Sequence, residues 1–143
     1  MTAFTPKRDD YREAVQQLHE AAKFCRHIGI DLDRIEPGLV TGSLVLKPEL
    51  TQQDGCAHAG LLASAADTVC GLTAYSLLEK GKNVLSVNLN ISLMSAARGK
   101  IVRAEGKVIK AGHRLYFTEG YVWSGDGETD KLVVKVSATM AVV

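Results

Sequence analysis

The stretch from Ala59 to Lys80 constrains the fold more than any other part of the chain. It is rich in alanine and leucine and carries almost no charge before its last residues, which indicates one long helix. Its many small residues would let a sheet approach closely, because bulky side chains at those positions would hold the sheet away. We expect the helix to end before Gly81, since glycine often caps a helix C-terminus.

The residues after this helix change to a period of two, which is typical of β-strands. Four runs rich in β-branched residues follow one another, and turn signals at residues 111–112 and 125–127 separate the last three. The pattern predicts a meander of four strands, over residues 84–94, 101–109, 115–123 and 132–143.

Before the long helix, the sequence predicts a hairpin. Apolar residues alternate from Ile28 to Leu32, residues 36–38 (Glu-Pro-Gly) mark a turn, and a second alternation runs over residues 39–46. Apolar residues between Asp9 and Phe24 recur at helical spacing, so we expect a helix on the outside of the protein. The length suits one domain over residues 1–143, in which residues 1–24 form an N-terminal helical extension.

The order of these elements predicts an α+β fold, with a six-stranded antiparallel sheet around one long central helix. Such a sheet leaves an edge open, and an open edge tends to pair with another strand. We therefore expect a homo-oligomer, either a dimer or a dimer of dimers.

Composition excludes several functional classes. The 17 Lys and Arg and the 16 Asp and Glu are spread along the chain, so no basic surface for nucleic acid is expected. The three cysteines form no CxxC pair and the four histidines lack metal-site spacing, so we expect neither a disulfide framework nor a metal or cofactor. No apolar stretch suits a membrane span or a secretory signal, and we expect a cytoplasmic protein.

Asp67 is the most informative polar residue, because it interrupts an apolar part of the long helix. Burying an isolated carboxylate is costly unless another group compensates its charge. Three interpretations stay open: a helix face that touches solvent, a helix-stabilising contact to a neighbour, or a catalytic base or nucleophile in a cleft.

The start of the helix provides a second candidate. His58 precedes it, either as a capping or surface residue or as a functional imidazole. The backbone N–H groups of Ala59 and Gly60 point out of the N-terminus and can polarise a carbonyl or hold an oxyanion. Ala59 and Asp67 lie about 12 Å apart along the helix axis, so one carbonyl carbon cannot touch both. If both act, the site lies between two subunits with antiparallel helices.

Polar residues outside the helix complete the candidates. The Gln52 amide can orient substrate or water, although the residue alone favours an ordinary solvated loop position. The Ser86 hydroxyl can position a water, or it is an ordinary strand-end hydroxyl. Cations can bind phosphate, but they are solvated hairpin residues in most proteins. The candidate cations are Lys110, His113, Arg114 and, separately, Arg98.

Residues 55–67, GCAHAGLLASAAD, resemble the hotdog-fold thioesterases, in the PaaI-like branch of phenylacetate-degradation type. The family pattern is G-x-x-H-G-G followed by a helix with an acidic residue, and Ala59 replaces the first glycine of H-G-G here. The similarity continues through residues 86–90, 94–99 and 112–114 and spans roughly residues 28–143. It implies a hotdog fold, in which a sheet wraps around one helix, and hydrolysis of acyl-CoA thioesters.

The resemblance also implies roles for individual residues. Asp67 falls on the catalytic carboxylate, and Ala59 falls on the glycine whose N–H polarises the thioester carbonyl. Gln52 falls on a residue that helps to hold substrate or water, and Ser86 on a water-positioning hydroxyl. The turn at residues 112–114 lies where members contact CoA phosphates. Whether Asp67 acts as general base or nucleophile stays open, as does the identity of the acyl group.

Two alternative functions remain open at this point. A hotdog hydratase or dehydratase pairs a histidine with an acid, and His58 makes such chemistry conceivable. A hotdog dimer that binds acyl-CoA without turning it over would act as a sensor. Thiol release distinguishes both from a thioesterase, because only hydrolysis breaks the thioester.

Overall fold

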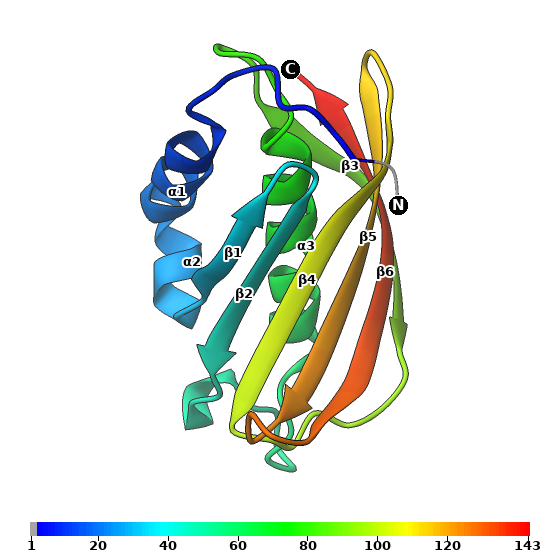
Figure 1. Ribbon diagram of the computed structural model, residues 1–143. Helices are drawn as coiled ribbons and strands as arrows, with labels where there is room; N and C mark the ends of the chain where they lie inside the picture. Colours follow the sequence, from blue (N-terminus) through cyan, green and yellow to red (C-terminus); the bar gives the residue numbers. More distant parts are fainter. Residues whose placement is uncertain (1–2) are drawn as a thin grey trace.

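A computed structural model describes residues 3–143 of the chain (Figure 1). One six-stranded antiparallel sheet, in the order β1-β2-β4-β5-β6-β3, curls around helix α3 (Ala59–Tyr75). The strands are β1 (Asp31–Glu36), β2 (Leu39–Val45), β3 (Val84–Leu93), β4 (Ile101–Ala111), β5 (Leu115–Gly125) and β6 (Asp130–Val142). A short 3-10 helix (Pro48–Leu50) lies between β2 and α3. The predicted α+β arrangement is confirmed.

Small residues on both sides allow the sheet to approach α3 closely. The helix contributes Ala66 and Cys70, which are fully buried. The sheet contributes Gly106 of β4 and Gly120 of β5, which are paired opposite each other. A Cβ at Gly106 would lie 2.5 Å from the carbonyl oxygen of Val69, and one at Gly120 would lie 2.8 Å from the Sγ of Cys70. The strand glycines therefore form the hollow in which the middle of α3 sits.

The long helix is shorter than predicted. It ends at Tyr75 rather than Lys80, and Gly81 lies in the loop to β3, so the prediction that Gly81 caps this helix is wrong. The buried Ser76 follows the last helical residue and its hydroxyl accepts from the N–H of Gly38 at 2.9 Å. This tertiary contact ties the end of α3 to the turn between β1 and β2.

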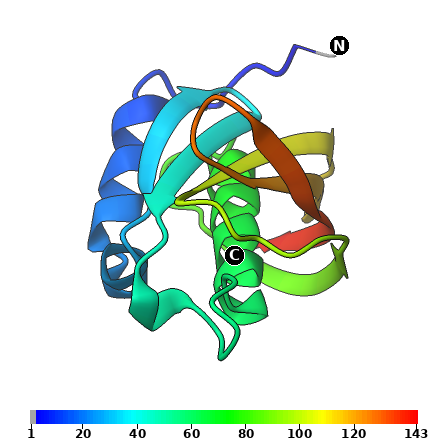
Figure 2. The same ribbon diagram turned by 90° about the horizontal axis from the view of Figure 1, so that it is seen from below.

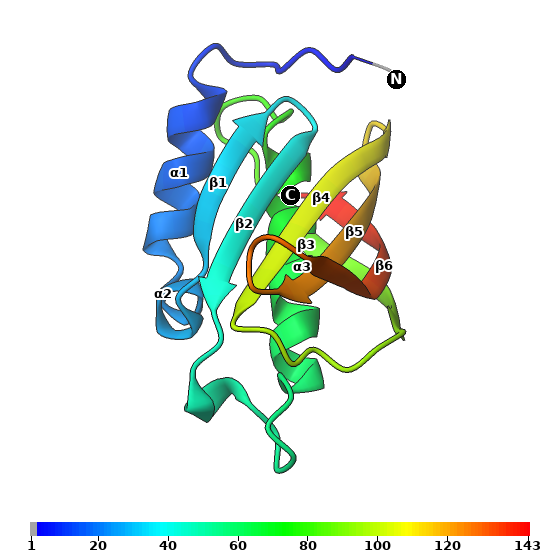
Figure 3. The same cartoon turned by 60° about the horizontal axis from the view of Figure 1, so that its bottom comes forward.

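Strand β3 does not belong to a meander with β4, so that part of the prediction is wrong. It pairs with β6 at the far edge of the sheet, and the chain crosses the ends of β5 and β6 to reach β4 (Figure 3). In residues 3–143 the other side of β3 has no strand neighbour. Large apolar side chains are exposed along it, including Leu85 at 61% and Val87 at 57%.

The predicted N-terminal helix is two helices, α1 (Tyr11–Ala21) and α2 (Lys23–Ile28). The backbone between them is extended at Ala22, with φ −80° and ψ 98°. In Figure 2 both helices lie beside α3, on the side that the sheet leaves uncovered. Cys25 of α2 places its Sγ 3.7 Å from the Oγ1 of Thr68 on α3, so the break at Ala22 brings the second helix against the central one.

Candidate active site

The loop before α3 carries Gln52, and Arg98 contacts the same loop near the start of that helix. The backbone N–H of Gln52 donates to the carbonyl of Cys56 at 2.8 Å, and its side-chain Oε1 accepts from the N–H of Asp54. The Nη1 of Arg98 lies 3.4 Å from the carbonyl oxygen of Asp54. Gln52 thus uses its amide oxygen to shape the loop, and its amide N–H₂ group is left to meet a substrate or a water.

His58 caps the helix. Its Nδ1 accepts from the N–H of Gly60 at 2.8 Å, so the neutral ring carries its proton on Nε2. A Cβ at Gly60 would lie 3.0 Å from this Nδ1, so the glycine makes room for the cap. Of the two amide groups expected to be free here, that of Gly60 is therefore occupied.

The N–H of Ala59 remains available. It has no hydrogen-bond partner among residues 3–143, and the residue is exposed at the first position of α3. No non-glycine residue in the described chain has a positive φ, so alanine in place of glycine creates no backbone strain here. A free N–H at the positive end of the helix dipole can stabilise an oxyanion.

Asp67 and Ser86 form the closest pair of candidate side chains. The Ser86 hydroxyl lies 2.6 Å from Oδ1 of the half-buried Asp67, a charge-assisted hydrogen bond. A β-bulge interrupts the ladder of β3 and β6 at Val87, directly after the serine. Bulges re-aim neighbouring side chains, and this one accompanies the turn of Ser86 toward the helix. Behind Ser86, the Sδ of buried Met140 lies 3.3 Å from its Oγ.

Both residues line a pocket of about 300 Å³ between the N-terminal helices, α3 and the start of β3. The acid and the serine are at one side, and the remaining wall is largely apolar. That wall consists of Leu18, His19, Ala22, Cys25, Thr68, Gly71, Leu72, Asn83 and Val84. The sequence did not reveal this wall, because its two sides are more than 40 residues apart in the chain.

Cys70 lies close to Asp67 on α3 but is not a nucleophile. Burial raises the pKa of its thiol to about 12, and the negative charge of Asp67 acts in the same direction. The thiol therefore stays protonated at neutral pH, and a protonated thiol is a poor nucleophile. The groups left for chemistry in this pocket are the carboxylate, the hydroxyl and water.

His113 and Arg114 line a second pocket, of about 400 Å³, beyond the C-terminal end of α3. Lys7 and Lys82 line it as well, and these two cations were missed because they are far from the turn in sequence. Lys110 belongs to the same hairpin but does not line the pocket. Three of the four residues named for phosphate binding are thus near one another, whereas Arg98 is at the opposite end of α3.

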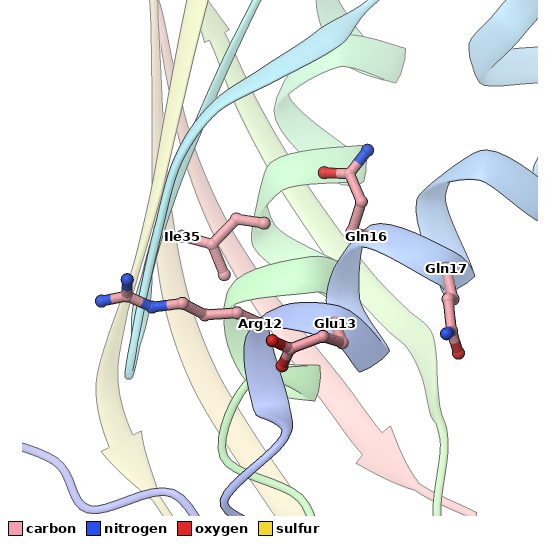
Figure 4. Close-up of a pocket in the computed structure, with 5 residues that line it drawn as sticks. All are labelled: Arg12, Glu13, Gln16, Gln17 and Ile35. Atoms are coloured by element: carbon pink, nitrogen blue, oxygen red, sulfur yellow. The ribbon is translucent and has the colours of Figure 1, made fainter.

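Another hollow lies between α1 and β1 (Figure 4). None of the candidate residues lines it. Its lining is Arg12, Glu13, Gln16, Gln17 and Ile35.

Along α3 the candidates fall into three separate groups. Within one chain, Asp67 and the Ala59 N–H are eight residues apart on a continuous helix, about 12 Å along its axis. One chain therefore does not bring the acid to the free amide. The groups are Gln52, His58, Ala59, Gly60 and Arg98 at the start of α3, Asp67 and Ser86 at its middle, and Lys110, His113 and Arg114 beyond its end.

Within residues 3–143, no group of three or more His, Cys, Asp or Glu residues is arranged to hold a metal ion. Among the helices of the same residues, none has the length and apolar character needed to cross a membrane.

Comparisons with known proteins agree with one another. Residues 54–131 match the thioesterase superfamily. Acyl-coenzyme A thioesterase 13 from Homo sapiens is 32% identical over 120 residues, which cover 82% of this chain and 83% of that protein. A thioesterase family protein from Silicibacter pomeroyi superposes with a TM-score of 0.91 at 25% identity, covering 93% of this chain and 98% of the other. The E. coli PaaI protein from the phenylacetic acid degradation operon superposes with a TM-score of 0.84 at 15% identity, over 94% of each chain, which is a likeness of fold.

Proposed function

Since the chain belongs to the thioesterase superfamily and is a thioester hydrolase, we propose that it hydrolyses acyl-CoA thioesters at a site shared between two subunits. The resemblance drawn from the sequence is confirmed for family and fold. The observation that carries the proposal is the 2.6 Å hydrogen bond that holds the Asp67 carboxylate in the wall of a pocket. The relationship to human acyl-coenzyme A thioesterase 13 supports CoA as the leaving thiol.

Asp67 supplies the reactive carboxylate. Because Ser86 donates to its Oδ1, Oδ2 is left to accept a hydrogen bond from water. As a general base, Asp67 takes a proton from this water while the water oxygen attacks the thioester carbonyl carbon. The C–S bond then breaks, the sulfur leaves as the CoA thiol after gaining a proton, and the carbonyl carbon ends as a carboxylic acid.

Direct attack by Asp67 is the other route that this geometry permits. It would form an anhydride between Asp67 and the acyl group, which water then hydrolyses. Single turnover in H₂¹⁸O identifies the nucleophilic route when water attacks the aspartyl carbonyl of this anhydride, because ¹⁸O then stays in Asp67 and a second turnover without label releases it. The general-base route leaves ¹⁸O only in the product acid, as does water attack on the acyl carbonyl of the anhydride.

The oxyanion of the tetrahedral intermediate needs a donor that Asp67 does not provide. We assign this role to the free N–H of Ala59 from the second subunit. Two copies can pair through their open β3 edges around a twofold axis. Such an axis reverses every direction perpendicular to it, so an axis perpendicular to α3 would place the two α3 helices antiparallel. The exposed Leu85 and Val87 of β3 supply apolar surface for such an interface. A dimer of two such dimers satisfies the same requirement.

Two further groups fit other parts of the substrate. The pocket with Lys7, Lys82, His113 and Arg114 has more basic than acidic residues in its lining, with Glu79 as the acid, and its basic side chains suit the phosphates of CoA. The free amide N–H₂ of Gln52 suits a water or the thioester carbonyl near the helix start. His58 is occupied as a cap through Nδ1, which weakens the case for a dehydratase with a histidine base.

The test is thiol release from a panel of acyl-CoAs, measured with a colorimetric thiol reagent. All three cysteines of the protein are buried, so the background is low. Asp67→Asn should lower kcat by about 10²- to 10⁴-fold, the usual contribution of a general base, without changing the circular dichroism spectrum or the oligomeric state. Asp9→Asn, an exposed acid on the N-terminal segment, is the matched control and should keep full activity. Full turnover in Asp67→Asn would exclude the assignment.

A further inference from the structure

Gly71 is a helix-interior glycine without a structural reason. It lies one turn after Asp67 on α3, and glycine there weakens a helix relative to alanine. Its φ is not positive, so the backbone does not require glycine. Nor does packing, because a Cβ added at Gly71 would meet nothing within 4 Å.

The strand glycines differ from Gly71 in what an added Cβ would meet. A Cβ at Gly106 or Gly120 would collide with α3 at 2.5 Å and 2.8 Å, so close packing explains both of them. The open space at Gly71 is instead part of the pocket that Asp67 lines. The absence of a side chain there leaves that space empty, one helical turn from the reacting carboxylate.

The rest of the pocket is mainly apolar, although His19, Thr68 and Asn83 also line it. Opposite α3, the N-terminal helices contribute Leu18, Ala22 and Cys25, and Ala22 is the small residue at the backbone break. The pocket holds about 300 Å³. A closed apolar cavity of about 150 Å³ accepts benzene in another protein; this pocket is open to solvent, and its larger volume has room for one aromatic ring with a linker or for a medium-length chain.

We propose that the acyl group of the substrate runs from the thioester carbonyl beside Asp67 across Gly71 toward Ala22, and that Gly71 sets the size of acyl group accepted. The acyl class is of medium length or carries a single aromatic ring. The inference rests on the proposed thioesterase function and adds the acyl selectivity of the same site. A side chain at position 71 would occupy the space through which the acyl group passes.

The experiment compares kcat/KM for acetyl-, hexanoyl-, phenylacetyl- and palmitoyl-CoA in wild type, Gly71→Ala and Gly71→Leu. Wild type should prefer hexanoyl- or phenylacetyl-CoA. In Gly71→Leu the ratio of hexanoyl to acetyl kcat/KM should fall by about 10- to 200-fold, the range for a steric change in an apolar pocket. Ala22→Leu, which fills the pocket from the opposite wall, should move the ratio in the same direction. Gly71→Ala should raise Tm, because alanine favours the helix.

Gln17→Leu is the matched control, since Gln17 is exposed on α1 and lines the separate hollow of Figure 4, not the pocket that contains Asp67 and Gly71. It adds an equally large apolar side chain and should leave the ratio unchanged. If wild type is active but Gly71→Leu and Ala22→Leu leave the ratio unchanged, the acyl path is wrong and the proposed function stands. If Gly71→Leu does not fold, Gly71→Ala and Ala22→Leu decide the question by the same ratio. If wild type releases no thiol from any substrate, the proposed function is wrong and this inference falls with it.

Discussion

Replacing Ala59 with proline should remove one catalytic hydrogen bond and almost nothing else. Ala59 is the first residue of α3, a position where proline is favoured because its missing N–H would have no helical partner. The preceding His58 has φ −62° and ψ 138°, the extended conformation that proline imposes on its neighbour. The N–H that disappears has no partner among residues 3–143, so no internal hydrogen bond is lost. Stability should therefore change by less than about 0.5 kcal/mol.

The effect on catalysis should be much larger. If the Ala59 N–H holds the oxyanion, its loss should lower kcat by about 10²- to 10³-fold, the effect of removing one such donor in other acyl-transfer enzymes. Thiol release gives kcat, and urea denaturation followed by circular dichroism gives the free energy of unfolding. Unchanged stability with unchanged kcat would show that this amide does not contact the reacting carbonyl.

The same variant tests whether the site is shared. Asp67→Asn and Ala59→Pro each inactivate both sites of their own homodimer. A mixed dimer would carry one site with Asp67 from the Ala59→Pro chain and the free N–H from the Asp67→Asn chain. Random reassortment makes about half of the dimers mixed, so activity should return to about a quarter of the wild-type value. No recovery after confirmed exchange of subunits would refute a site that combines Asp67 of one subunit with the Ala59 N–H of the other.

Other parts of the fold give three simpler predictions. Gly106→Ala should destabilise the protein by about 1–3 kcal/mol in urea denaturation, since its Cβ would meet backbone atoms of Val69 that cannot move aside. An unchanged free energy of unfolding would contradict the close approach of sheet and helix. In the folded protein at pH 8 a thiol reagent should label none of the three cysteines, whereas urea should expose all three. Cys70 should react least because burial raises the pKa of its thiol to about 12, and rapid labelling before unfolding would show that this core is open. The backbone N–H groups of Thr129 and Glu128 lower the pKa of Asp126, so its charge stabilises the fold above the unfolded-state pKa and this contribution is lost as pH falls through the lower folded-state pKa. Asp126→Asn should therefore lower Tm at pH 7 but not at a pH well below 3.8, and an equal Tm loss at both would rule out the charge as the cause.

Much of the fold follows from local patterns. The small residues of the central helix and the alternation of the later strands predicted a sheet around one helix. The errors concern contacts between distant segments. Alternation marks residues 84–93 as a strand but cannot reveal that its partner is β6, almost 50 residues later. Residues 79–81 (Glu-Lys-Gly) have the composition of a helix end. The helix nevertheless ends earlier, where the N–H of Gly38 donates a buried hydrogen bond to the hydroxyl of Ser76.

The candidate site divides in the same way. Asp67 was visible because a carboxylate in an apolar helix needs a reason, and the helix start was visible from the rules of helix ends. Ser86 was only a weak candidate from the residues alone, because a serine in a strand has no local signature, and the family resemblance gave it a definite role. The basic pocket gained Lys7 and Lys82, and the apolar wall gained Ala22, only when distant segments came together.

The pairing of β3 with β6 has a consequence for how the protein is made. Ser86 sits opposite Met140 in that ladder, whereas Asp67 belongs to a helix completed long before β6 emerges from the ribosome. During synthesis the residues of the central helix and of β3 thus leave the ribosome before β6 exists, and β3 then lacks the one strand that it pairs with in the complete fold. The acid and its serine can settle only when the last strand arrives. A translation product that stops near residue 130 would contain both residues and still lack the site. Its unpaired β3 would be free to form non-native pairs with other strands.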